Sequence, residues 1–370
     1  MAVVIRSASA SAPAHKIEAA PPPQRYARGW HCLGLAADYA DGKPHALDIF
    51  GTRLVAFQGQ DDKQFYVLDA WCPHMGADLG IGCVKGNSVV CKFHGWAWGG
   101  DGACTEIPYA KRIPPKARIK SWPTLVENKL LFVWNDPEGN PPDPAQKIPR
   151  IEPVFQPEEW SDWSLVKWTI HNNCRELIDN IADVAHFVSV HGSDNVVYFA
   201  NLFEGHKATQ VMVGANRRLG GGEYLTTIAS YYGPAYQITH MFGKMGGHPV
   251  ESILMNSHTP IDPNRFELRF GVLVKKFPGM SAEQCEAMVK QYVDLTNKAF
   301  SEDVEIWHNK VRIDNPLLCD GDGPVYQNRQ WYEQFYMDAA SVPAELKQRR
   351  FFEIDHGIER KPEIRHAFDN

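Results

Sequence analysis

Two short stretches, Cys72-Pro73-His74 and Cys91-Lys92-Phe93-His94, decide which fold this sequence is expected to have. Each stretch pairs one thiol with one imidazole, and thiolate and imidazole ligands together suit iron–sulfur clusters, zinc or copper. Glycines surround both stretches and allow sharp turns and close approach of the backbone; they are Gly76, Gly80, Gly82, Gly95, Gly99, Gly100 and Gly102. The sequence therefore predicts a metal centre held between two tight loops.

The spacing of the four ligands separates two kinds of metal centre. A Rieske 2Fe–2S cluster takes two thiolates on one iron and two imidazoles on the other, and each loop supplies one of each. A structural zinc site is the alternative, but it usually begins with a Cys-x2-Cys or His-x3-5-His pair, and neither occurs in these loops. We therefore predict a Rieske cluster on Cys72, His74, Cys91 and His94.

Length and composition indicate a protein of two domains that binds neither nucleic acid nor membrane. The chain has 370 residues, with 44% apolar and 22% charged residues, which is ordinary for a globular protein. Its net charge is −6, and no basic run resembles those that follow a phosphate backbone. Neither a membrane span nor a signal peptide is recognisable, so we expect a cytoplasmic protein.

Eight cysteines would allow disulfides, but a reducing compartment favours other roles. Those outside the two ligand stretches are expected to be small buried hydrophobic side chains; they are Cys32, Cys83, Cys104, Cys174, Cys285 and Cys319.

Composition divides the chain into three parts. Residues 1–24 are rich in Ala, Ser and Pro and predict a disordered tail. Short apolar runs separated by turn residues then predict an all-β domain over residues 25–140. A proline-rich connector at 136–144 marks the boundary, and longer strand-like runs predict one antiparallel sheet within 141–370.

Two helical patterns interrupt this second domain. Ser281 followed by Gln284 is a capping box that opens a long amphipathic helix over residues 281–309. Residues 172–188 form the other pattern, and Asn180, Asp183 and His186 would share one side of that helix. Solvent exposure alone would explain such a polar side.

His191 makes a second metal site the better interpretation. On a straight helix its ring and that of His186 would point about 140° apart, so the helix must end or bend between them. Two histidines and one carboxylate would form the facial triad of non-haem iron oxygenases. We predict Asp303 of the long helix as the carboxylate, with Glu302 and Glu305 as alternatives.

Together these motifs resemble those of the Rieske non-haem iron ring-hydroxylating oxygenases, and within them the oxygenase components of the 3-ketosteroid 9α-hydroxylase family. The motifs that carry the superfamily resemblance are Cys-x-His, Cys-x2-His and Asn-x2-Asp-x2-His-x4-His. Similarity to the steroid branch lies in residues 28–35, 98–102, 131–136, 139–142, 203–206, 231–234, 274–276, 303–307 and 313–318. The chain departs from that branch at 192–198, at Gly95 and Ala97, and at Cys83.

The resemblance implies a helix-grip (START-like) catalytic domain, in which a curved antiparallel sheet wraps around a long helix. It also implies mononuclear Fe(II) on His186, His191 and Asp303, with Asn180 beside them. Asp183 would carry electrons to the iron from the cluster of a neighbouring subunit in a homotrimer; the alternative is a carboxylate that orients His186 within its own subunit. The expected substrate-binding residues are Gln210, Tyr232, Asn256, Phe300 and Trp307, although Phe300 and Trp307 equally suit ordinary core packing.

The implied activity is hydroxylation of a 3-ketosteroid at the 9α position, with O2 as co-substrate, during steroid and lipid degradation. Electrons would come from NADH through a separate flavin and iron–sulfur reductase, because the chain has no dinucleotide-binding fingerprint. The alternatives are a bile-acid or other steroid substrate, dihydroxylation of an aromatic ring, a Rieske electron carrier without oxygenase activity, and a zinc-organised binding module.

Overall fold

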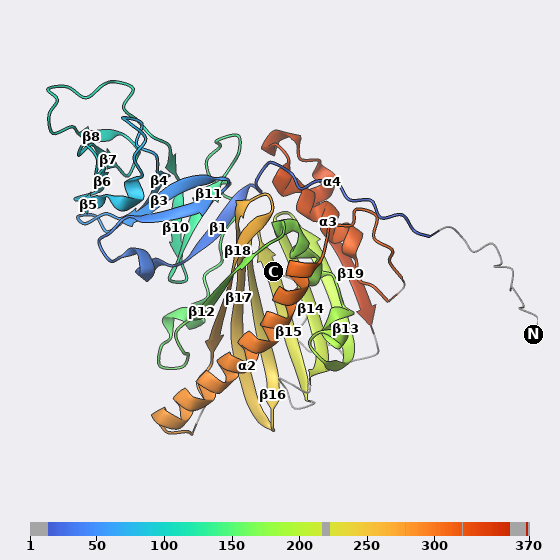
Figure 1. Cartoon of the computed structure of the whole chain (residues 1–370). Helices are drawn as coiled ribbons and strands as arrows, with labels where there is room; N and C mark the ends of the chain where they lie inside the picture. Colours follow the sequence, from blue (N-terminus) through green and yellow to red (C-terminus); the bar gives the residue numbers. More distant parts are fainter. Residues whose placement is uncertain (1–13, 217–222, 278, 320, 356–367, 369–370) are drawn as a thin grey trace, which may run out of the picture.

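The computed structural model describes residues 14–216, 223–277, 279–319, 321–355 and 368. An N-terminal β domain lies beside a larger domain made of one broad sheet and a long helix (Figure 1). This architecture confirms the predicted α+β class. Over the described residues, no helix has the length and apolar character needed to cross a membrane.

Three small antiparallel sheets make up the N-terminal domain. One has the order β1-β11-β10, with β1 at Gly29–Leu35, β10 at Thr124–Glu127 and β11 at Leu130–Asn135. Another has the order β2-β3-β4-β9, with bounds His45–Ile49, Thr52–Gln58, Phe65–Asp69 and Ser121–Trp122. The last runs β5-β6-β7-β8, with bounds Cys83–Lys85, Ser88–Val90, Ala97–Gly99 and Cys104–Glu106. The two ligand loops follow β4 and β6.

The C-terminal domain is built on an eight-stranded antiparallel sheet with the order β12-β18-β17-β16-β15-β14-β13-β19. Its strands are Ser164–Ile170, Ser193–Glu204, Lys207–Asn216, Tyr224–Tyr232, Tyr236–Met245, His248–Asp262, Arg265–Val274 and Arg350–Asp355, for β12 to β19 in chain order. β13 includes residues 193–198, which belong to the segment where the chain departs from the steroid branch. That segment is a strand because it pairs with β14 across two register shifts.

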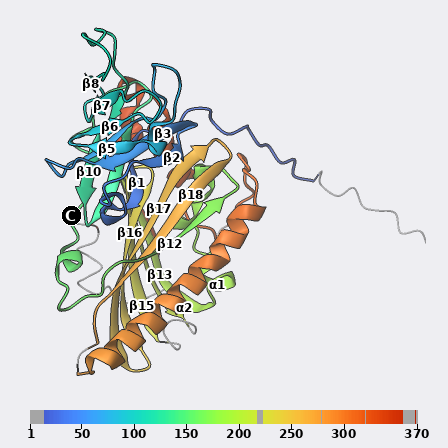
Figure 2. The same ribbon diagram turned by 60° about the vertical axis from the view of Figure 1, so that its left-hand side comes forward.

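The long helix α2, Ala282–Asn309, crosses the concave side of this sheet (Figure 2). Its capping box is present as predicted, with the backbone N–H of Gln284 donating to Ser281 Oγ at 3.2 Å. Phe300 stacks on Phe270 of β18 with ring centroids 3.9 Å apart. The predicted arrangement of a curved sheet around a long helix is therefore confirmed. The remaining α-helices of the described residues are α1 at His186–Ser189, α3 at Val325–Glu333 and α4 at Ala344–Lys347.

The helix predicted over 172–188 is wrong, because the segment breaks into short turns. It contains 3-10 helices at Cys174–Glu176 and Ile178–Ile181 before α1. Asn173 Oδ1 accepts the backbone N–H of Arg175 at 3.0 Å, and Asp183 Oδ1 accepts that of Ala185 at 3.0 Å. Such local bonds between side chain and backbone compete with a continuous helix.

Two smaller expectations also need correction. From residue 14 the N-terminal tail is fixed, since the N–H of Glu18 donates to Asn315 Oδ1 at 2.9 Å and that of Asp314 to the carbonyl of Glu18 at 2.8 Å; residues 1–13 lie outside the described residues. Cys83 and Cys319 are exposed rather than buried. Cys83 lies on a three-residue strand whose middle side chain alone points inward.

The two domains share a hydrophobic core. Phe132 of β11 packs edge-on against Tyr236 of β16, with ring centroids 5.0 Å apart. Two buried histidines also lie on the strands that bring the domains together, His31 on β1 and His258 on β17. Neither ring nitrogen of His258 has a hydrogen-bond partner within the described part of the chain. The junction therefore holds imidazoles that are stable only in their neutral form.

These histidines predict a loss of stability in mild acid. Burial lowers the pKa of His31 to about 4 and that of His258 to about 3, whereas in the unfolded chain both lie near 6.5. Below pH 6.5 the unfolded chain therefore binds more protons, so the free energy of unfolding falls until the folded pKa values are reached. Between pH 7 and 5 we expect a loss on the order of 2 kcal/mol per histidine. The free energy of unfolding of wild type and His258→Phe can be measured in urea between pH 7 and 5. The prediction would be contradicted if this free energy fell equally with pH in the two proteins.

Candidate active site

The two ligand loops have the same backbone construction. The N–H of Gly76 donates to the carbonyl of Cys72 at 2.8 Å, and the N–H of Gly95 donates to that of Cys91 at 3.0 Å. Both glycines have positive φ, +76° and +74°. A Cβ on Gly95 would also lie 2.9 Å from Pro108. Glycine closes each turn because other residues rarely adopt this conformation.

The four predicted cluster ligands lie together between these loops. Cys72 and Cys91 are buried, and burial raises the pKa of the Cys72 thiol. The rings of His74 and His94 meet edge to face, with centroids 4.6 Å apart. His94 Nδ1 is buried without a hydrogen-bond partner among the described residues. Two buried thiols and an unpartnered imidazole nitrogen form a donor set that fits a 2Fe–2S cluster.

The second predicted metal site is also assembled. His186, His191 and Asp303 each present a ligand atom, and these atoms lie within 4.8 Å of one another. His191 Nε2 is 3.1 Å from Asp303 Oδ2. The expected bend occurs because α1 ends at Ser189 and Gly192 has φ +67°. This brings the two histidine rings to 5.3 Å, so all three side chains can bind one ion.

Neighbouring groups orient these ligands. His186 Nδ1 donates to the backbone carbonyl of Asp183 at 2.7 Å, which leaves Nε2 for a metal. Asn180 Nδ2 donates to Asp303 Oδ1 at 3.3 Å, which leaves Oδ2 on the side of His191. Burial lowers the pKa of His186, and a metal binds the neutral imidazole.

Asp183 itself has a more exposed carboxylate. Its Oδ2 lies 3.8 Å from His186 Nδ1, and its side chain is 38% exposed. The backbone carbonyl of Asp183 binds the ring of His186, while its carboxylate accepts the backbone N–H groups of Ala185 and His186, at 3.0 and 3.3 Å.

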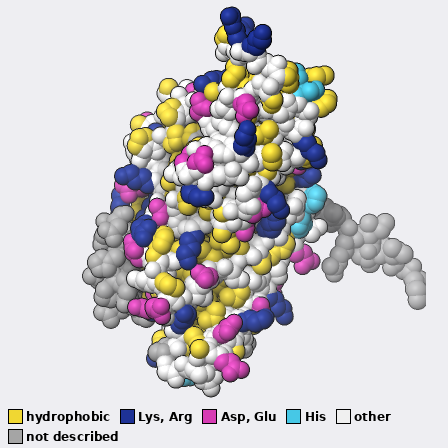
Figure 3. All heavy atoms as spheres, turned by 90° about the vertical axis from the view of Figure 1, so that its left-hand side faces the viewer, with side chains coloured by type: hydrophobic (Ala, Val, Ile, Leu, Met, Phe, Trp, Pro, Cys, Tyr) yellow, Lys and Arg dark blue, Asp and Glu magenta, His cyan; other side chains and the backbone are white. Residues whose placement is uncertain are grey.

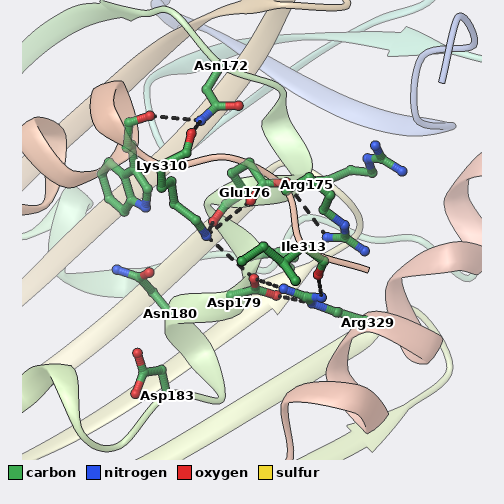
Figure 4. A network of polar contacts seen from close by, with 12 residues as sticks. Asn172, Arg175, Glu176, Asp179, Asn180, Asp183, Lys310, Ile313 and Arg329 are labelled. Carbon is green, nitrogen blue, oxygen red and sulfur yellow. Dashed lines mark hydrogen bonds and ion pairs between the residues drawn. The ribbon is translucent and has the colours of Figure 1, made fainter. Parts of the chain in front are cut away.

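A buried ion network, which sequence reasoning missed, supports the metal site (Figure 4). Arg329 of α3 donates to both carboxylate oxygens of Asp179, at 2.9 and 2.7 Å. Lys310, directly after α2, lies 3.1 Å from Glu176 Oε2. The only signal in the sequence was the pair of acids among the apolar residues of 172–188. Paired in this way, they hold the segment leading to His186 beside the end of α2, which carries Asp303.

A cavity of about 1090 Å³, including the open space at its mouth, extends from the three metal-site residues between α2 and the sheet. Gln210, Asn256, Phe300 and Trp307 line it, as expected. Most of the remaining lining is apolar; it includes Met212, Leu225, Met241, Leu254 and Phe270. Its mostly apolar lining suits a mainly apolar small molecule.

Tyr232 was wrongly assigned to this lining. It packs instead against the core that the two domains share, and Tyr231 lines the cavity. Adjacent residues of β15 point to opposite faces of the sheet, so a shift of one position moves a side chain out of the cavity.

Comparison with known proteins agrees with this geometry. Residues 29–123 match the Rieske 2Fe–2S domain, and residues 133–336 match the 3-ketosteroid 9alpha-hydroxylase C-terminal domain. The oxygenase component of 3-ketosteroid-9-alpha-monooxygenase from Rhodococcus rhodochrous is 48% identical over 350 residues, which cover 92% of this chain and 89% of that one. The protein of the same name from Mycobacterium tuberculosis is 48% identical over 348 residues, which cover 92% of this chain and 89% of that one.

Solved structures share the fold at much lower identity. Dicamba monooxygenase bound to 3,6 dichlorosalicylic acid has a TM-score of 0.69 and 18% identity, covering 86% of this chain and 100% of that one. NdmB of Pseudomonas putida CBB5 has a TM-score of 0.66 and 17% identity, and the match covers 88% of this chain and 96% of that one. With its two domains, its two sets of ligand side chains and these relatives, the chain belongs to the Rieske monooxygenases of the 3-ketosteroid-9-alpha-monooxygenase oxygenase-component family.

Proposed function

We propose that the protein hydroxylates a 3-ketosteroid at the 9α position, as the oxygenase component of a two-component system that degrades steroids in the cytoplasm. One atom of O2 enters a C–H bond and the other leaves as water. A separate flavin and iron–sulfur reductase supplies the electrons from NADH. The observation that carries the proposal is the mostly apolar cavity whose lining includes His186, His191 and Asp303.

In this proposal Cys72, His74, Cys91 and His94 hold the cluster, while His186, His191 and Asp303 hold Fe(II). When bound, the iron supplies the centre at which dioxygen is activated. The chain contributes orientation and exclusion of water. The Asp183 carbonyl fixes the ring of His186, Asn180 fixes Asp303, and the apolar walls keep bulk water from the substrate.

Buried amides provide the polar anchors for the substrate. Gln210 Nε2 and Asn256 Oδ1 are buried in the cavity wall and have no partner within the described residues. Leaving such groups unpaired costs free energy, so a ligand that pairs them gains affinity. A steroid ketone accepts hydrogen bonds, and in our proposal Gln210 donates to it.

Replacing Gln210 with leucine should therefore weaken substrate selection. Loss of one hydrogen bond of about 1.4 kcal/mol lowers kcat/KM for a 3-ketosteroid roughly 10-fold. Steady-state kinetics on the 3-ketosteroid and on its 3-deoxy analogue provide the check, since the analogue should be equally poor with both proteins. Gln64→Leu, at an exposed site in the other domain, is the matched control. An unchanged kcat/KM would remove Gln210 from the substrate site.

We further propose a head-to-tail homotrimer, in which Asp183 carries electrons from the cluster of one subunit to the iron of the next. The partly exposed Asp183 carboxylate supports this role. So do exposed apolar side chains on both faces that would meet, Met75 in the first cluster loop and Val188 and Ile306 near the iron site. Such side chains are typical of surfaces that are covered in an assembly.

The test of the activity is turnover with a surrogate NADH-dependent reductase. Purified protein is incubated with a panel of 3-ketosteroids and bile-acid-like compounds, and products are identified by mass analysis. We expect a product heavier by one oxygen atom, with the label in 18O2 experiments appearing equally in steroid and water. A cis-diol formed from an aromatic substrate, with no steroid product, would contradict the proposal.

A further inference from the structure

The charge of the chain is unevenly distributed. Residues 83–118 contain six basic and two acidic side chains, a net charge of +4 in a chain whose total is −6. The acids are already paired, Glu106 with Lys85 at 3.0 Å and Asp101 with Arg118 at 3.5 Å. Figure 3 shows Lys and Arg side chains gathered at the top of the molecule, at the tip of the N-terminal domain.

The remaining basic side chains define a surface that we call the basic tip. They are exposed and have no acidic partner within 4 Å among the described residues; they are Lys92, Lys111, Arg112 and Lys116. Most lie on the long connection from β8 to β9, which projects from the domain in both ribbon views (Figures 1 and 2). Phe93, Tyr109 and Ile113 are exposed between them, at 58%, 62% and 41%. The basic tip thus combines positive charge with exposed apolar groups.

The basic tip is connected to a cluster ligand through one intervening side chain, Trp96. The hydroxyl of Tyr109 accepts a hydrogen bond from Trp96 Nε1 at 2.7 Å. The indole of Trp96 stacks on the imidazole of His74, with centroids 4.7 Å apart and planes at 13°. A protein bound on this loop would therefore lie two side chains away from the cluster.

We propose that the basic tip binds the electron-donor protein through an acidic surface of that protein. The proposal rests on the proposed function, which requires such a donor. One electron leaves the reduced donor and enters the cluster, and NADH restores the donor. Charge complementarity accelerates the encounter and makes it sensitive to salt, as a transient redox complex requires.

A second copy of this chain is a poorer occupant of the basic tip. Permanent interfaces between subunits are large and depleted of charged residues at their centre, whereas electron-transfer complexes are small and short-lived. The basic tip carries four exposed charges around three apolar side chains, which is typical of the surfaces of electron-transfer complexes.

The test is a triple variant, Lys111→Gln, Arg112→Gln and Lys116→Gln, in the complete cluster-loaded protein. Stopped-flow absorbance follows reduction of its cluster by a purified NADH-dependent flavin and iron–sulfur reductase, at low and at high salt. We expect the second-order rate constant at low salt to fall at least about 10-fold, with little salt dependence left. Reduction by dithionite should be unchanged. A control variant that neutralises the exposed Lys147, Lys290 and Lys298 should behave as wild type.

Equilibrium binding of the same reductase provides a readout that does not need turnover. The Kd of the reductase for the triple variant should rise as the rate constant for reduction falls. Unchanged reduction rates and Kd in the triple variant would overturn the inference. So would a variant that dissociates into smaller assemblies by light scattering while its reduction rate is kept, since the basic tip would then bind another copy of the chain. Neither measurement needs a substrate, so a failure to hydroxylate steroids would be recognised separately.

Discussion

Replacing His186 with alanine is expected to abolish steroid hydroxylation while the 2Fe–2S cluster is retained. The imidazole lies within 4.8 Å of the other two predicted iron ligands, and its ring is already fixed by the carbonyl of Asp183. Removing it leaves one histidine and one carboxylate, which cannot complete a facial triad. Iron should fall from about three to about two atoms per chain, and turnover by more than roughly 100-fold.

Metal analysis, the visible spectrum of the cluster and product formation are the three measurements needed. His240→Ala is the matched control, because His240 also pairs with a carboxylate, Glu251 at 2.9 Å, but lies outside the cavity. That variant should keep its iron and its activity. If His186→Ala lost the cluster spectrum and continued to hydroxylate, the assignment of the two metal sites would be wrong.

Asp183→Asn should separate electron delivery from iron binding. The amide keeps an oxygen that can accept the N–H of Ala185, now bound at 3.0 Å, so the turn into α1 is preserved while the negative charge is lost. The backbone carbonyl that orients His186 is unaffected. We therefore expect full iron content, an intact cluster and a turnover rate reduced about 10- to 100-fold.

The measurement is a single turnover that starts from protein whose cluster has been reduced with dithionite. In Asp183→Asn, oxidation of the cluster on mixing with steroid and O2 should be slowed by the same factor as product formation. Asp179→Asn removes a neighbouring carboxylate that is buried and bound to Arg329, and is expected to lower stability rather than this rate. Normal cluster oxidation in Asp183→Asn would show that its carboxylate takes no part in electron delivery.

Local signals account for what could be predicted about the fold. The capping box at Ser281 and Gln284 is completed within four residues, and it correctly positioned α2. One of the short apolar runs of the first domain, at residues 65–69, forms β4 and follows a turn at residues 60–62. Residues 172–188 gave a false helix, because their periodicity was real but the side chains of Asn173 and Asp183 bind the backbone and interrupt it.

The sequence by itself determined which side chains are available to bind metal, because Cys and His ligands in short loops need only local backbone geometry to come together. Only the tertiary structure decided how distant segments meet. It brings Asp303 to His191, buries Glu176 and Asp179 against Lys310 and Arg329, and turns Tyr231 rather than Tyr232 into the cavity. These outcomes depend on strand register and on contacts between residues more than a hundred positions apart, which no local pattern of residues encodes.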